Sequence, residues 1–213
     1  MAQRIQVIAH RGAHESAAEN SLEAYRAAIE LGCDYIEIDL RTAPDGRMLI
    51  KHNALEAGEA LPSFDEVLAL AQGRIRIYLD VKQAMPASIV AAVERAGMRE
   101  WIVTYGSFEL LRDLVRLRPG WPVMPEAVNA ERLERSLREL KPPAVAFSGG
   151  DFRPELVKRA REAGCEVFLD RQGKTDSAEF WQKAVDDGAT GIQTDRPRAL
   201  LAWLRGKGLH AEG

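Results

Sequence analysis

The first part of the chain carries residues whose types could together transfer protons and bind an anion or a cation. His10 and Arg11 end one apolar segment, and Glu37 and Asp39 lie two positions apart in a second. A histidine can transfer a proton, and a guanidinium can bind anionic oxygens. Two carboxylates on one face of a strand repel each other unless a cation or a shared proton relieves them. These residue types predict a metal-assisted site for an anionic substrate.

Asp80 and Lys82 follow a third apolar segment and also lie two positions apart. Asp80, Glu37 and Asp39 would form an oxygen-ligand set suited to Mg²⁺ or Ca²⁺, with a substrate phosphate completing the shell. Lys82 could add a positive charge against that phosphate. Two alternatives stay open. Asp80 and Lys82 could be a surface ion pair, and the acids of the second segment could face solvent on a strand edge.

A second histidine could join this site. After the second apolar segment, Pro44-Asp45-Gly46 is a strong turn signal, and the short apolar run MLIKH follows it. This pattern predicts a small hairpin that brings His52 back over the same edge as His10. Two histidines beside one metal-bound phosphate can divide proton removal and proton donation between them. A lone histidine more often has a structural role, and we expect His14 only to line the turn.

The elements that must position these residues repeat one theme, in which a helical pattern ends in Gly and an apolar segment follows. A glycine just past a helix accepts the left-handed conformation that closes the last turn. Repeated helix-Gly-strand units predict a parallel sheet built from βα modules. The expected strands are Ile5–Ala9, Tyr35–Leu40, Ile75–Val81, Trp101–Tyr105, a weak one near Pro122–Pro125, Ala144–Phe147, Glu166–Leu169 and Gly191–Thr194.

Each of these strands precedes a helical pattern, so the sequence predicts eight βα units. That number favours a compact, closed α/β barrel of the (β/α)8 type with short loops, and a doubly wound open sheet is the alternative. The parallel strands of such a barrel end at one edge, where the side chains named above would meet. A length of 213 residues suits one substantial core, so we expect a single domain over residues 1–213.

Composition excludes several classes of protein. The 29 basic and 32 acidic residues are well mixed, which argues against a general binder of nucleic acid or anionic membranes. No apolar run approaches the roughly 20 residues of a transmembrane segment, and the N-terminus has no signal-peptide layout, so we expect a cytoplasmic protein. Cys33 and Cys165 are expected to be buried small hydrophobic residues.

The order of these motifs resembles the glycerophosphodiester phosphodiesterases, a family of TIM barrels. The resemblance is dense over residues 8–82 and sparse but collinear afterwards. The matching motifs are His10-Arg11-Gly12, Glu19-Asn20-Ser21, Gly32-Cys33-Asp34, Glu37-Ile38-Asp39, Thr42-Ala43-Pro44-Asp45-Gly46, His52-Asn53, Leu61-Pro62-Ser63-Phe64-Asp65-Glu66-Val67-Leu68 and Thr194-Asp195-Arg196-Pro197.

The resemblance implies metal-dependent hydrolysis of a small glycerophosphodiester to glycerol 3-phosphate and an alcohol. The chemistry of the family is often drawn with the glycerol hydroxyl of the substrate attacking phosphorus, followed by opening of a cyclic phosphate by water. By match, the acid and base would be His10 and His52, the ligands of Mg²⁺ or Ca²⁺ would be Glu37, Asp39 and Asp80, and the phosphate binders would be Arg11 and Lys82.

The chain departs from the family pattern in four places. Asn53 replaces an Asp, Asp80 replaces a Glu, and most of the usual insertion after His52 is missing. The segment Leu169-Asp170-Arg171-Gln172 replaces the Trp-Thr-x-Asn of the seventh strand end. The last two changes leave the alcohol open, and the sequence does not indicate the oligomeric state. The alternative functions are a lysophospholipase D or sphingomyelinase D-like headgroup hydrolase and a barrel that binds metal or phosphoester without turnover.

Overall fold

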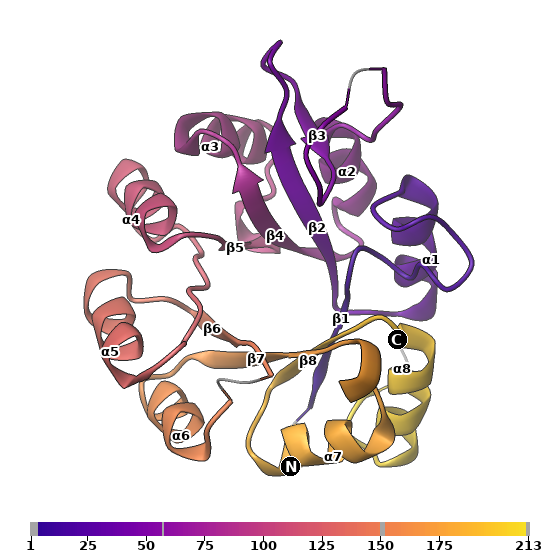
Figure 1. Ribbon diagram of the computed structural model, residues 1–213, viewed down its shortest axis with the longest axis vertical. Coiled ribbons are helices and arrows are strands. Elements are labelled where there is room, and N and C mark those ends of the chain that lie inside the picture. Colours follow the sequence, from indigo (N-terminus) through magenta and orange to yellow (C-terminus); the bar gives the residue numbers. More distant parts are fainter. Residues whose placement is uncertain (1–3, 57, 150–151, 212–213) are drawn as a thin grey trace.

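A curled parallel sheet forms the centre of the computed structural model, which describes residues 4–56, 58–149 and 152–211. The strands follow the neighbour order β5-β4-β2-β1-β8-β7-β6 and curve into a nearly closed barrel with helices around it (Figure 1). Over the described ranges the parallel strands are β1 (Gln6–Ala9), β2 (Tyr35–Thr42), β4 (Arg76–Gln83), β5 (Ile102–Tyr105), β6 (Ala144–Phe147), β7 (Glu166–Arg171) and β8 (Gly191–Thr194). The predicted barrel is confirmed in preference to the open sheet.

Helices connect successive strands and cover the outside of the barrel (Figure 1). They are α1 (Leu22–Leu31), α2 (Phe64–Ala71), α3 (Pro86–Arg95), α4 (Phe108–Leu117), α5 (Ala130–Glu139), α6 (Pro154–Glu162), α7 (Ala178–Asp186) and α8 (Pro197–Gly206), with short 3-10 turns η1 (Arg99–Trp101) and η2 (Gly173–Thr175). Every predicted helical pattern therefore forms a helix. In the part of the chain that the structure describes, no helix is long and apolar enough to cross a membrane.

The weak strand expected near Pro122–Pro125 does not form a regular strand. The segment bonds on one side to β5, where Thr104 N donates to Pro122 O and Met124 N donates to Thr104 O. On its other side Ala146 N, in β6, donates to Pro125 O. Proline has no backbone N–H, so the segment cannot continue either ladder. The barrel thus has seven regular parallel strands among the described residues, and an irregular segment occupies the eighth position.

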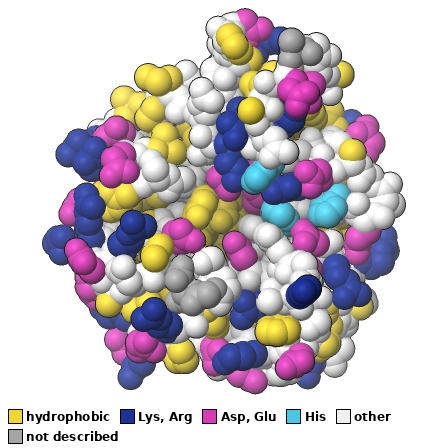
Figure 2. Space-filling model, in the orientation of Figure 1, with side chains coloured by type: hydrophobic (Ala, Val, Ile, Leu, Met, Phe, Trp, Pro, Cys, Tyr) yellow, Lys and Arg dark blue, Asp and Glu magenta, His cyan; other side chains and the backbone are white. Residues whose placement is uncertain are grey.

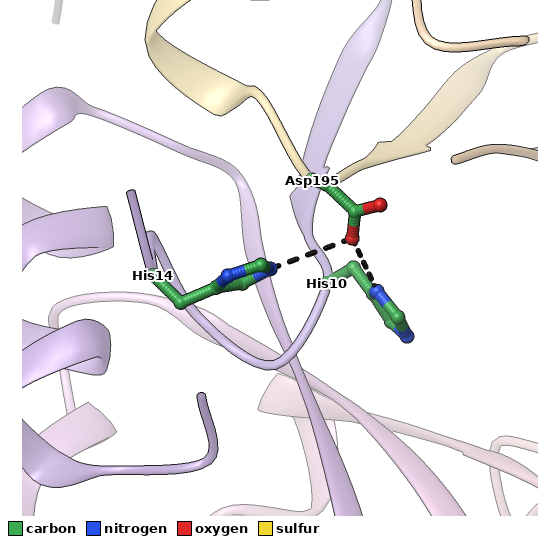
Figure 3. A group of neighbouring side chains, drawn as sticks. All are labelled: His10, His14 and Asp195. Carbon is green, nitrogen blue, oxygen red and sulfur yellow. Dashed lines mark hydrogen bonds and ion pairs between the residues drawn. The ribbon is translucent and has the colours of Figure 1, made fainter. Parts of the chain in front are cut away.

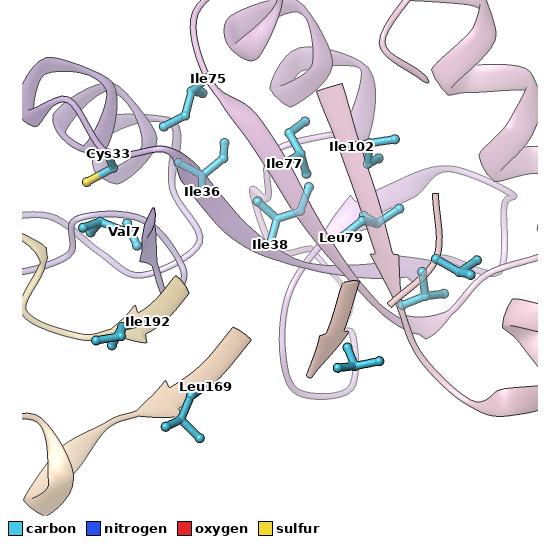
Figure 4. Packing of buried hydrophobic residues seen from close by; sticks show 14 of the residues in the cluster. Val7, Cys33, Ile36, Ile38, Ile75, Ile77, Leu79, Ile102, Leu169 and Ile192 are labelled. Atoms are coloured by element: carbon cyan, nitrogen blue, oxygen red, sulfur yellow. The ribbon is translucent and has the colours of Figure 1, made fainter. Parts of the chain in front are cut away.

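Alternation along the strands separates two apolar layers. Alternate side chains such as Ile36 and Ile38 pack outward among the helices, as Figure 4 shows for several strands. The other set fills the barrel itself, where the rings of Tyr35 and Phe168 meet edge to face at 5.4 Å. Both Cys33 and Cys165 are buried with free thiols, as expected. The interior is packed near the strand starts, which leaves the polar residues of each strand toward its end.

The predicted hairpin is also present. Strand β3 (Met48–Ile50) pairs antiparallel with the end of β2, where Leu40 lies opposite Ile50. The described residues 51–56 and 58–63 lie between β3 and α2. The hairpin therefore extends beyond the carboxyl end of β2 and returns the chain to that end of the barrel.

Candidate active site

Three carboxylates meet where β2 and β4 end. The two strands are neighbours in register, with Asp39 directly opposite Asp80, and Glu37 precedes Asp39 on the same face. One ligand atom from each acid lies within 4.8 Å of the others, and Glu37 and Asp39 are only 2% and 1% exposed. The alternative of a solvent-facing strand edge is wrong, because these two acids are buried.

Burial and mutual repulsion disfavour the charged forms of these acids. Burial and the charges of Asp39 and Asp80 raise the pKa of Glu37 well above its usual value. Burial also raises the pKa of Asp80, although Lys82 offsets part of that effect. An all-oxygen set of this kind fits Mg²⁺ or Ca²⁺, whose charge would relieve the repulsion.

Lys82 lies among these acids. Its Nζ is 2.7 Å from Asp80 Oδ2 and 3.2 Å from Asp39 Oδ1, and its side chain is 23% exposed. Burial works against its charge, but the two carboxylates outweigh burial and raise the pKa of Lys82. The alternative of a simple surface ion pair does not describe this residue, because it bridges two strand ends.

The turn after β1 holds Arg11 against the acids. Arg11 has a φ of 52° and Gly12 a φ of 84°, and a Cβ on Gly12 would lie 2.7 Å from Ala24 Cβ. Only glycine fits there, because both the backbone conformation and the close approach of α1 exclude a side chain. The turn lets Arg11 N donate to Glu37 Oε2 at 2.9 Å and places Arg11 Nε 3.2 Å from Asp39 Oδ2. Its Nη1 bonds Glu19.

Asn20 is a site residue that the sequence reasoning did not identify. Ser21, not Asn20, caps α1, by accepting from Ala24 N. The buried amide of Asn20 donates to Asp39 Oδ2 at 2.8 Å, and Tyr25 Oη donates to its carbonyl oxygen at 2.8 Å. Asn20 has a φ of 56°, which Asn tolerates better than most residues. It therefore orients one of the acids.

His10 is held by a second residue that sequence reasoning missed. Strands β1 and β8 are paired with Ala9 opposite Thr194, so the residues after them are neighbours. His10 Nδ1 lies 2.7 Å from Asp195 Oδ1 (Figure 3). His10 Nε2 lies 3.9 Å from Glu37 Oε2. The predicted closure of the barrel was the indication that could have revealed this pair, because closure makes the last strand a neighbour of the first.

Asp195 is itself fixed by its surroundings. Burial opposes its charge, but hydrogen bonding and the charge of His10, together with the backbone N–H of Gly173, lower its pKa to about 2. The backbone N–H of Asp195 donates to buried Asp176 at 2.9 Å. His14 Nε2 lies 3.4 Å from Asp195 Oδ1, so the expectation that His14 only lines the turn is wrong.

His52 returns to this end of the barrel on the hairpin. Lys51 N donates to Asp39 O, and the guanidinium of Arg41 donates to His52 O at 2.7 and 3.1 Å. The side chain of His52 borders a cavity of about 180 Å³ that Asn20 also lines. Its Nδ1 lies 3.1 Å from Asn53 Oδ1. Six of the seven residues singled out from the sequence lie toward the carboxyl ends of β1, β2 and β4, and the seventh, His52, lies on the segment that follows β3.

A larger cavity adjoins the acids. It measures about 580 Å³ and runs from Asp80 and Lys82 past Tyr105 and Glu126 toward α4 and α5. Figure 2 shows acidic, basic and histidine side chains gathered around the middle of this face. Across the barrel, burial and the charges of Glu126 and Asp80 raise the pKa of Asp170 to about 7. The altered end of β7 therefore adds an acid to this face.

The family model and a curated relative that match this chain name the same family. Residues 10–59 match the model of the glycerophosphoryl diester phosphodiesterase family. The chain is 25% identical over 245 residues to a glycerophosphodiester phosphodiesterase of Caldanaerobacter subterraneus subsp. tengcongensis, covering 93% of this chain and 97% of the relative. It is 33% identical over 243 residues to the uncharacterized protein YqiK of Bacillus subtilis, covering 93% and 98%.

Solved structures agree on the fold. A putative glycerophosphodiester phosphodiesterase from Galdieria sulphuraria superimposes with a TM-score of 0.86 at 19% identity, over 96% of this chain and 99% of that one. A phosphodiesterase from Oleispira antarctica, solved with the product sn-glycerol-3-phosphate, gives 0.80 at 18% identity over 94% and 96%. These likenesses show that the barrel architecture is shared.

Proposed function

The chain belongs to the glycerophosphodiester phosphodiesterase family, and we propose that it hydrolyses glycerophosphodiesters to sn-glycerol 3-phosphate and an alcohol with the help of a divalent cation. The observation that carries the proposal is the meeting of Glu37, Asp39 and Asp80 within 4.8 Å, next to a histidine that a carboxylate orients. The family relatives support the reaction class. The site supports the requirement for a cation.

The three acids are the proposed ligands, and Mg²⁺ or Ca²⁺ is the proposed ion. When bound, such an ion supplies positive charge that polarises a phosphoryl oxygen. Asn20 keeps Asp39 oriented for this purpose through its 2.8 Å hydrogen bond. Outer contacts of this kind fix ligand geometry and tune affinity.

Arg11 and Lys82 are the proposed phosphate binders. Each already contacts a proposed metal ligand, which supports a role for both in binding a phosphate beside the acids. An anionic substrate would compete with the carboxylates for the guanidinium and the ammonium group. Their positive charges would then stabilise the negative charge as it shifts from the attacking to the leaving oxygen.

His10 and His52 are the proposed acid and base. When His10 Nδ1 donates to Asp195, Nε2 keeps its lone pair and can accept the proton of the attacking hydroxyl, on the side where Glu37 lies. His52 would give a proton to the leaving oxygen. The alcohol would lie in the cavity of about 580 Å³ beside Asp80.

Three substrate classes separate this proposal from its alternatives. The purified protein is incubated with a water-soluble glycerophosphodiester, a lysophospholipid and sphingomyelin, each with Mg²⁺, with Ca²⁺ and with a chelator. We expect release of sn-glycerol 3-phosphate from the soluble diester, and loss of that release on chelation. Turnover of only the lipids would favour the headgroup hydrolases. Cation or phosphoester binding without turnover of any substrate would favour the non-catalytic barrel.

A further inference from the structure

A second group of metal-ligand side chains lies beside the acidic set. His10 at the end of β1, His14 in the loop before α1 and Asp195 at the end of β8 point toward one another (Figure 3). One ligand atom of each lies within 4.8 Å of the others. Two imidazoles and one carboxylate differ in kind from the three carboxylates of Glu37, Asp39 and Asp80.

We propose that His10, His14 and Asp195 form a separate binding site for a borderline-soft divalent cation such as Zn²⁺ or Co²⁺, and that occupation of this site inhibits the enzyme. The metal site stands on its own geometry, whereas its inhibitory effect rests on the proposed function. Imidazole nitrogen favours Zn²⁺ and Co²⁺, while all-oxygen sets favour Mg²⁺ and Ca²⁺. The two neighbouring groups should therefore select different ions.

The distances suit a small tetrahedral ion. Ligand atoms about 2.0–2.1 Å from zinc are about 3.4 Å from one another. His14 Nε2 and Asp195 Oδ1 are already 3.4 Å apart. His10 Nδ1 and Asp195 Oδ1, at 2.7 Å, need to separate by under about 1 Å as the cation replaces the hydrogen-bonding proton.

The group is reachable from solvent. The side chains of His10, His14 and Asp195 are 14%, 25% and 30% exposed, so an ion could enter without unfolding of the barrel. Three protein ligands leave a fourth tetrahedral position for water. The backbone N–H of Gly173, 3.3 Å from Asp195 Oδ2, holds the carboxylate from its other oxygen and leaves Oδ1 for the cation.

Inhibition follows from the two nitrogens of His10. A neutral imidazole binds a metal through its unprotonated nitrogen. If Nδ1 of the neutral ring binds the cation, the single ring proton must lie on Nε2: Nδ1 gives its proton to solvent while Nε2 takes one up, so the ring stays neutral. His10 Nε2 lies 3.9 Å from Glu37 Oε2, so a ring protonated at Nε2 can no longer accept a proton on the side of the acids.

The test uses the whole protein in excess Mg²⁺, which is added to fill the proposed site of Glu37, Asp39 and Asp80. Zn²⁺ is titrated by calorimetry and Co²⁺ by its visible absorption, for wild type, His14→Ala, His14→Cys and His52→Ala. We expect one Zn²⁺ per chain in wild type and His52→Ala, at least a tenfold weaker affinity in His14→Ala, and recovery in His14→Cys. The Co²⁺ spectrum should show a four- or five-coordinate ion that His14→Ala loses.

The inhibitory effect is measured separately, as the ratio of activity with and without Zn²⁺ for wild type, His14→Ala and His14→Cys. Wild type should be inhibited, and His14→Ala should need at least tenfold more Zn²⁺. Equal affinity in wild type and His14→Ala, or loss of affinity in His52→Ala alone, would overturn the site. Zinc bound as predicted without inhibition would overturn the inhibition only. A wild type without phosphodiesterase activity would refute the proposed function and leave the binding result intact.

Discussion

His10 Nδ1 lies 2.7 Å from Asp195 Oδ1, although the two residues are 185 positions apart in the chain. The contact exists because β8 closes the barrel against β1. It orients the ring so that Nε2 faces Glu37 at 3.9 Å. Asp195 is thus a positioning residue for the proposed base, and it acts through His10 rather than on a substrate.

Asp195→Asn should lower kcat by roughly 10²-fold with little change in KM. Asparagine cannot enforce the proton on His10 Nδ1, and general acid–base catalysis by a positioned side chain contributes about 10²–10⁴-fold. Steady-state kinetics with a glycerophosphodiester measures both constants, and Asp195→Glu should restore part of kcat. The control is Asp45→Asn, which removes an exposed acid on the hairpin turn. An unchanged kcat in Asp195→Asn would show that the pairing is structural only.

Asn20→Gly should weaken Mg²⁺ or Ca²⁺ binding by about 10- to 100-fold, which is the usual effect of losing an outer contact to a ligand. Glycine accepts the positive φ of this position, so the change removes the amide without straining the backbone. Calorimetry of cation binding measures the effect. Loss of the buried amide removes one hydrogen bond to Asp39, which Arg11 and Lys82 still contact, and leaves the hydroxyl of Tyr25 without its acceptor.

Ser21→Ala is the matched control for Asn20→Gly. It removes the N-cap of α1 one position further on and should cost about 1 kcal/mol of folding stability with no loss of cation affinity. Equal cation affinity in Asn20→Gly and wild type would contradict the orienting role. An equal weakening in both variants would assign the effect to the turn as a whole.

The metal-free protein should become less stable as pH rises above about 4.5. Folding raises the pKa of Glu37, so in this range the folded state keeps a proton that the unfolded chain has released. The free energy of unfolding therefore falls until pH passes the raised pKa. Mg²⁺ or Ca²⁺ should raise Tm most at the upper end of this pH range, where the ionised carboxylates repel one another most strongly.

Glu37→Gln isolates this effect. In the metal-free protein near pH 8 it should stabilise the fold by about 1 kcal/mol or more, roughly 2–4 °C in Tm, and should flatten the dependence of Tm on pH. Glu94→Gln, which removes an exposed acid paired with Arg118, should leave that dependence nearly unchanged. A fall in the Tm of metal-free Glu37→Gln at pH 8 would contradict the electrostatic account.

Much of the fold could be predicted from the sequence because each unit carries local signals. Glycines in the left-handed conformation close helices, as at Gly32, and buried strands have continuous apolar character. The expected ends of the seven regular strands differ from the observed ones by at most two residues, because terminal pairing depends on neighbours. The strand expected near Pro122–Pro125 does not form, because its prolines lack the backbone N–H donors that a β-ladder needs.

The residues proposed for the chemistry were found from type and spacing, whereas the residues that orient them were not. The role of Asn20 was not predicted, because its left-handed backbone and its bond to Asp39 depend on the packing of the turn against β2. Asp195 lies at the far end of the chain, and its partner follows only from the order of strands. Residue type reveals chemistry locally, while orientation is a property of the closed barrel.

The most direct test of the central claim measures release of sn-glycerol 3-phosphate from one soluble glycerophosphodiester by wild type, His10→Ala, His52→Ala and the exposed-acid control Asp45→Asn. Wild type and the control should release the product only with a divalent cation. Each histidine variant should lose at least about 10²-fold in rate while retaining binding of Mg²⁺ or Ca²⁺ by the three acids. Absence of release by wild type with every cation, or undiminished release by both histidine variants, would contradict the assignment of this activity to the site.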